Sequence, residues 1–141
     1  ITSDKKLSKK YGAFQSLLTE VGNRDIPAEV LSQINERIQR VNAFHGSPKA
    51  FKKVLRKERS AIINVLEKEL KIVPKGHYQN TWMAIGMSAF GIPMGVAFGA
   101  ALDNMAFLAI GIPIGMGIGI AIGAAMDEKA AKEGRQLSVE A

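Results

Sequence analysis

The side chains best suited to acid–base chemistry in this sequence are its two histidines, His45 and His77. An imidazole acts as a general acid or base when a partner acid or nucleophile lies within hydrogen-bond reach. The sequence places no such partner at a useful spacing from either histidine. The chain also has no cysteine, which removes thiol nucleophiles and zinc–thiolate sites. We therefore predict no catalytic residue, no metal site, no cofactor and no enzyme activity.

Glycine is the second residue type here that could bind a ligand, since glycine-rich loops hold phosphate groups in nucleotide sites. Nine of the fourteen glycines lie in one stretch, residues 81–126. This stretch contains neither a P-loop ending in Gly-Lys-Ser/Thr nor a Gly-x-Gly-x-x-Gly motif after a strand. Its 46 residues carry one formal charge, at Asp103. The glycines are therefore predicted to pack helices in an apolar environment.

The length of this apolar stretch predicts two membrane-spanning helices. As one helix, residues 81–126 would extend about 69 Å, more than twice the ~30 Å hydrocarbon core of a bilayer. Asp103 and Asn104 suit a turn near the middle, because such residues cap the helix that follows. The predicted transmembrane hairpin thus comprises residues 81–102 and 105–126, with its turn at 103–104. Ion handling by Asp103 is an alternative, which the turn position disfavours.

Glycines recur at intervals of four residues along both predicted spans. Without side chains, such positions let helix backbones approach closely in lipid. The glycines of these two ladders are Gly91, Gly95 and Gly99 on the first span and Gly111, Gly115, Gly119 and Gly123 on the second. Over residues 86–126 the sequence resembles bacterial glycine-zipper membrane proteins, which implies tight helix packing and often oligomerisation. The ladders could pack the hairpin internally or build a homo-oligomer, and we favour the homo-oligomer.

A proline lies inside each predicted span. Pro93 and Pro113 each remove a backbone hydrogen-bond donor, so we expect kinks near Ala89 and Ala109. The kinks could be packing adaptations or hinges.

Residues 1–74 show three segments with apolar residues on one helical stripe. Gly22 and Gly46 follow the first two segments, while Pro48 opens the third and Pro74 ends it. Short connections between three such helices predict an antiparallel bundle. The predicted fold class is therefore all-α, with an N-terminal three-helix antiparallel bundle followed by a two-helix transmembrane glycine-zipper hairpin.

Charge sets the expected orientation. Residues 1–80 hold sixteen Lys or Arg and eight Asp or Glu, and residues 127–141 add Lys129, Lys132 and Arg135, whereas the turn has no positive charge. The positive-inside rule then predicts a multi-pass protein with both termini in the cytoplasm. The bacterial resemblance implies the inner membrane. Residues 127–141 are predicted to form a cytoplasmic tail and residues 75–80 an interfacial linker. Tyr78 in this linker and Trp82 just after it are predicted to anchor the chain at the headgroups, and the alternative is that they are ordinary linker aromatics.

Basic residues cluster on the third predicted helix, and membrane lipids are their expected partner. An anionic surface attracts such side chains by about 1 kcal/mol each. The cluster comprises Lys52, Lys53, Arg56, Lys57 and Arg59. The alternative is a solvated helix face. The aromatic residues lie on apolar stripes or in turns rather than among these cations, so we expect no nucleic-acid binding.

The sequence is compatible with two classes of function. One is an oligomeric scaffold or partner subunit, which would also contact a cytoplasmic or membrane protein. The other is a pore or channel, such as a toxin or effector, because the apolar hairpin resembles that of pore-forming colicins in pattern only. Between Ile85 and Leu102 the only hydroxyl belongs to Ser88, and residues 105–126 have none. The absence of a polar stripe favours assembly over conduction.

Overall fold

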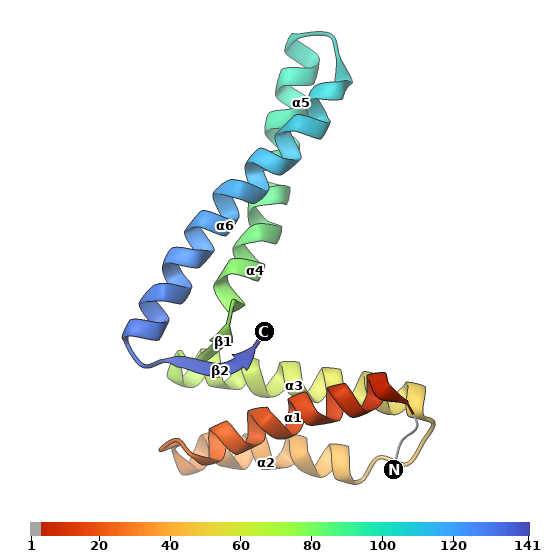
Figure 1. Ribbon diagram of the computed structural model, residues 1–141, viewed down its shortest axis with the longest axis vertical. Coiled ribbons are helices and arrows are strands. Elements are labelled where there is room, and N and C mark those ends of the chain that lie inside the picture. Colours follow the sequence, from red (N-terminus) through yellow and green to blue (C-terminus); the bar gives the residue numbers. More distant parts are fainter. Residues whose placement is uncertain (1–3) are drawn as a thin grey trace. The chain divides into compact units, whose positions relative to one another are not determined.

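The computed structural model describes residues 4–141, which divide into two compact units (Figure 1). One unit runs to Pro74 and includes Leu137–Val139, and the other consists of Lys75–Gln136 with Glu140–Ala141. Helices make up most of both units, and an apolar two-helix hairpin follows a helical bundle. The predicted all-α fold class is thus confirmed, with one small sheet added.

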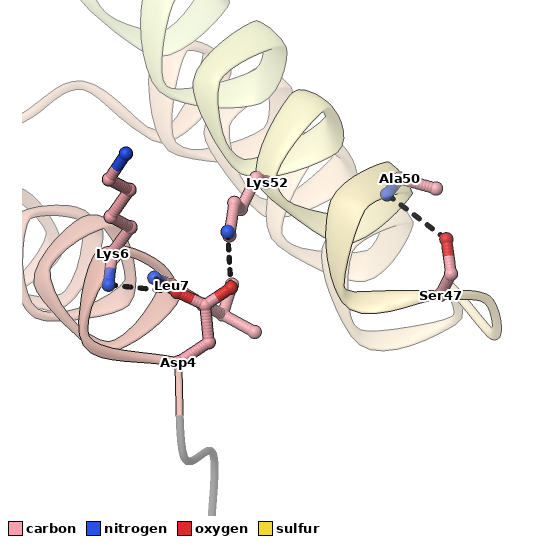
Figure 2. Close-up of polar contacts among 6 residues, drawn as sticks. All are labelled: Asp4, Lys6, Leu7, Ser47, Ala50 and Lys52. Atoms are coloured by element: carbon pink, nitrogen blue, oxygen red, sulfur yellow. Dashed lines mark hydrogen bonds and ion pairs between the residues drawn. The ribbon is translucent and has the colours of Figure 1, made fainter.

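The first unit contains three helices, α1 (Lys5–Gly22), α2 (Ala28–Asn42) and α3 (Pro48–Leu70), and α3 packs against the other two (Figure 1). The Asp4 carboxylate accepts hydrogen bonds from the first amides of α1, while the Ser47 hydroxyl accepts from the Ala50 amide at 3.3 Å (Figure 2). Each cap satisfies amides that lack an intrahelical partner. Lys71, with a left-handed φ of 56°, ends α3.

The core of this unit comes from the apolar stripes that the sequence predicts. Among the largest side chains with almost no exposure are Leu17 of α1 and Leu55, Ile62 and Leu66 of α3. Burial of each contributes about 1.5–3 kcal/mol. Glu58 lies among them with 3% exposure and pairs with Arg37 at 3.4 Å.

A two-stranded sheet, absent from the sequence prediction, is formed by β1 (Val73–Lys75) and β2 (Gln136–Glu140). Leu137 of β2 is 1% exposed and belongs to the core of the first unit. The Ser138 amide donates to the Glu20 carboxylate at 2.6 Å. The segment predicted as a cytoplasmic tail, residues 127–141, is therefore ordered, because β1 and the bundle core supply partners that lie far away in the sequence.

The second unit is the hairpin. Its first arm consists of α4 (His77–Ile85), a π-helical turn η1 (Gly86–Gly91) and α5 (Ile92–Ala101). A 3₁₀ turn, η2 (Met105–Phe107), leads into the second arm, α6 (Leu108–Lys132). The helices extend beyond the predicted spans, since α4 begins within the predicted linker 75–80 and α6 continues past residue 126.

Candidate functional site

The inner surface of the hairpin is made of glycine. From α4 to residue 126, every buried residue is a glycine. We call these eight residues the glycine seam: Gly86, Gly91, Gly95 and Gly99 on the first arm, and Gly111, Gly115, Gly119 and Gly123 on α6. The structure therefore places all seven predicted ladder glycines in contacts within one chain.

The seam brings backbone against backbone. A Cβ added at Gly111 would lie 2.5 Å from the Gly91 carbonyl oxygen and 2.6 Å from the Gly95 Cα. At Gly119 it would overlap the Trp82 carbonyl group. Side chains have no room at these positions, so dispersion and weak Cα–H···O contacts hold the two arms together. Gly117 differs, because a Cβ there meets no atom within 4 Å.

Gly86 belongs to the seam, although it lies outside the four-residue ladder that the sequence shows. Five residues separate Gly86 from Gly91, and an α-helix would rotate them onto different faces. The structure forms a π-helical turn over this interval, in which the Ile92 amide donates to the Met87 carbonyl five residues earlier. The wider turn keeps both glycines buried. In the sequence, the five-residue spacing between Gly86 and Gly91, just before Pro93, is the feature that could have indicated this turn.

The two prolines lie in different surroundings. Pro93 is in the first turn of α5, directly after the π-helical turn that covers Ala89, where the sequence predicts a kink. Pro113 lies inside the continuous helix α6. Pro93 has no backbone N–H to donate. The π-helical turn at Gly86–Gly91 accommodates this loss, because its hydrogen bonds join residues five apart instead of four.

At the tip, the predicted turn residues have distinct backbone roles. Asp103 adopts a left-handed φ of 49°, and the Asn104 side chain accepts a hydrogen bond from the Ala106 amide at 3.0 Å. Asn104 thus caps η2. Asp103 is exposed.

At the opposite end of the hairpin, Asp127 caps α4 from the other arm. Its two carboxylate oxygens accept hydrogen bonds from the amides of Tyr78 at 3.1 Å and Gln79 at 2.9 Å. Asp127 is 7% exposed and continues the face of the α6 glycines by one further turn. A carboxylate at a helix N-terminus satisfies free amides and interacts favourably with the helix dipole. This contact explains why α4 starts before the apolar stretch.

We expect Asp127→Ala to destabilise the base of the hairpin by about 1–2 kcal/mol, because two amides of α4 lose their acceptor. Hydrogen exchange at Tyr78 and Gln79 should accelerate about tenfold. The matched control is Glu128→Ala, which removes an exposed carboxylate that pairs with Lys132 at 2.6 Å. Equal acceleration in both variants would show that loss of negative charge, rather than the cap, is responsible.

The predicted interfacial aromatics both lie in α4 and are partly buried. Tyr78 contacts the ring of His77 edge-on, with 5.3 Å between centroids, and the Trp82 carbonyl faces Gly119. The ring of His77 thus has the aromatic ring of Tyr78 as a neighbour. Within residues 4–141, no three potential metal ligands come together.

The predicted lipid-binding cations of α3 differ in their surroundings. Lys53, Arg56 and Lys57 are exposed. Lys52 pairs with the Asp4 carboxylate (Figure 2), and this pairing lowers the pKa of Asp4. Arg59 is partly buried, and burial lowers the pKa of its guanidinium. The spacing of these residues in the sequence does not distinguish the three exposed cations from the paired Lys52 and the partly buried Arg59.

The outer surface of the hairpin is apolar. The segments His77–Ala101 and Met105–Lys132 are long and apolar enough to cross a membrane. Only 22% and 17% of their most apolar windows are buried, whereas the core helix of a soluble protein is mostly buried. The exposed large side chains of α6 include Ile110, Ile114, Ile118 and Ile122.

Fold and site together define a small helical protein with an apolar, glycine-packed hairpin. Comparison with known proteins finds no matching family model, no matching curated protein and no matching solved structure.

Proposed function

We propose that this chain is an integral membrane protein whose hairpin crosses the bilayer twice. The observation that carries the proposal is the inverted distribution of side chains in the hairpin: glycines lie inside, and large apolar side chains lie outside. Contiguous apolar surfaces of this kind are rare on soluble monomers. Lipid chains cover such a surface at no cost, because they are as apolar as the side chains.

The dimensions of the two arms fit a bilayer. The first segment has 25 residues and the second 28, which correspond to about 37 Å and about 42 Å of helix. Each exceeds the ~30 Å hydrocarbon core and leaves its ends in the headgroup layers. Tyr78 and Trp82 both lie near the start of the first arm, where amphipathic rings are favoured.

Both ends of the hairpin are expected on the same side of the membrane. The strands that flank the hairpin, β1 and β2, pair with each other, which requires their meeting in one compartment. The turn around Asp103 has no Lys or Arg, whereas residues 1–80 hold sixteen Lys or Arg and eight Asp or Glu. The positive-inside rule then favours cytoplasmic termini and, in a bacterium, the inner membrane.

Self-association, if it accompanies insertion, must use the outward faces. The glycine seam is occupied by the opposite arm, so it offers no surface to a second copy. Gly117 lies on an open face of α6, with Ala121 one turn further. An oligomeric scaffold or partner subunit would assemble through such a face. Conduction is the weaker alternative, because the closely packed seam leaves no passage within one hairpin.

Insertion and topology can be tested with single-cysteine variants, since the natural chain has no cysteine. Ala106→Cys places the thiol at the tip, Ala43→Cys places it in the bundle, and Ile114→Cys places it within α6; all three positions are exposed. In spheroplasts, a membrane-impermeant maleimide should label residue 106, reach residue 43 only after permeabilisation, and leave residue 114 unlabelled.

Two outcomes would contradict parts of this proposal. Equal labelling of all three positions, with the protein in the soluble fraction, would refute membrane insertion. Labelling of residue 43 but not residue 106 in intact spheroplasts would refute only the orientation.

A further inference from the structure

Positive charge in the bundle is concentrated at one end. α1 and α3 both begin at this end, where Lys52 pairs with Asp4 (Figure 2). α2 finishes there too, since Phe44, just after α2, stacks on Phe51 with 5.8 Å between ring centroids. We call this half, residues 4–19 and 36–63, the basic end. The positive dipole ends of α1 and α3 add to its potential.

The two halves of the bundle differ strongly in charge. The basic end holds twelve Lys or Arg and three Asp or Glu, whereas residues 20–35 and 64–74 hold three Lys or Arg and five Asp or Glu. Two of the three acids at the basic end, Asp4 and Glu58, are paired with Lys52 and Arg37. The basic end therefore presents a large uncompensated positive potential.

Most of these cations are exposed to solvent. On α1 they include Lys6, Lys9 and Lys10, and on α3 they include Lys53, Arg56 and Lys57. Twelve cations with only three acids among them repel one another, and this repulsion opposes the compact state unless an anionic partner neutralises it. The arrangement is typical of a surface for a diffuse anionic partner.

We propose that the basic end docks on anionic phospholipid headgroups of the membrane that holds the hairpin. The proposal rests on the proposed insertion, because the hairpin tethers the bundle to that membrane and raises the local lipid concentration. Lysine dominates the basic end, and its ammonium acts as a point charge toward headgroups. Nucleic acid fits less well, since Phe44 and Phe51 stack on each other instead of offering a platform for bases.

The partner surface proposed here is larger than the α3 cluster that the sequence indicates. It gains the lysines of α1, which the fold brings to the same end of the bundle. It loses Lys52, which is paired with Asp4, and Arg59, which is partly buried. The half of the bundle that leads into β1 is net negative, so charge attraction to lipid is expected at the basic end only.

The test uses the full chain in nanodiscs with a fluorescent donor on Ser8→Cys, an exposed position of α1, and an acceptor on the headgroups. Insertion is established first in pure phosphatidylcholine. Replacing about a third of that lipid by phosphatidylglycerol should raise energy transfer, and about 1 M salt should abolish the increase, because the Debye length falls to about 3 Å.

A charge-neutralised variant makes the test specific. Lys53→Gln, Arg56→Gln and Lys57→Gln together should lower the docking equilibrium constant on the order of a hundredfold, about fivefold per residue. The control, Lys68→Gln with Lys71→Gln and Lys75→Gln, removes the same charge near the other end and should leave docking almost unchanged. Circular dichroism verifies that both variants stay helical.

Three results would overturn the proposal. Energy transfer that does not respond to phosphatidylglycerol would exclude lipid docking while leaving the insertion result intact. Equal losses in the two triple variants would attribute the effect to net charge rather than to the basic end. Clustering of separate anionic vesicles without a change in nanodisc energy transfer would show that the basic end binds an opposing membrane instead.

Discussion

The hairpin of Gly119→Ala is expected to open, whereas that of Gly117→Ala is expected to keep its structure. A Cβ at Gly119 would overlap the Trp82 carbonyl group, and the helix backbone has no flexible side chain that could move aside. Forced separation of packed elements costs about 1–3 kcal/mol, and more where backbone opposes the new atom. Gly117 faces open space, and alanine there improves helix propensity by up to about 1 kcal/mol.

The measurement is the distance between spin labels on the two arms, at Ser88→Cys and Ala121→Cys, both exposed positions. The distance should increase in Gly119→Ala, and further when Gly115→Ala is added, because a Cβ at Gly115 would lie 2.5 Å from the Gly91 Cα. Unchanged distances in the double variant would contradict the close backbone packing of the two arms at the glycine seam. Gly117→Ile serves a second purpose: a change in particle size for this variant alone would place a self-association surface on the outer face.

Leu137→Ala is expected to destabilise the helical bundle by about 2–5 kcal/mol, although residue 137 lies beyond the hairpin in the sequence. The Leu137 side chain is 1% exposed and fills part of the core of the first unit. Removing buried methyl groups costs transfer free energy and leaves a cavity. Hydrogen exchange of the amides in α1 and α3 measures the loss directly.

The matched control is Leu31→Ala, an identical change at a position of α2 that is 37% exposed. Its expected cost is much smaller, since most of the removed surface was already in contact with water. If both variants exchange equally fast, Leu137 does not belong to the cooperative core. If neither differs from the natural chain, β2 is not docked.

Local periodicity was enough to predict most of the fold. Apolar residues at intervals of three and four located the three bundle helices, and Pro48 and Pro74 marked the limits of the third. The length of the stretch from residue 81 to residue 126, with its polar pair Asp103 and Asn104, located the hairpin and its turn. These features depend only on residues close together in the sequence, so a single sequence is enough to predict the positions of the helices and the turn.

Contacts between distant residues were not predictable in the same way. Asp127 is in helical register with the seam glycines, yet nothing in the sequence shows that its carboxylate meets the amides of Tyr78 and Gln79. Leu137 and Val139 alternate as in a strand, but a five-residue strand gives a weak signal until its partner β1 is known. A four-residue ladder does not predict Gly86, because its five-residue spacing from Gly91 fits a π-helical turn rather than an α-helix.

The periodicity of the glycines also does not distinguish packing within one hairpin from packing between two chains. Glycine ladders on Gly91 and Gly115 would look the same whether they met within one chain or between two. Within the single chain, these glycines contact the opposite arm of the hairpin.

The docking of Leu137 in the bundle core has a consequence for the order of events during synthesis. Helices α1 to α3 leave the ribosome first, but the residue that completes their core is translated only after both arms of the hairpin. At a translation rate of about 5–20 residues per second, Leu137 is synthesised several seconds after the end of α3. The core of the bundle therefore lacks Leu137 until both arms of the hairpin have been translated.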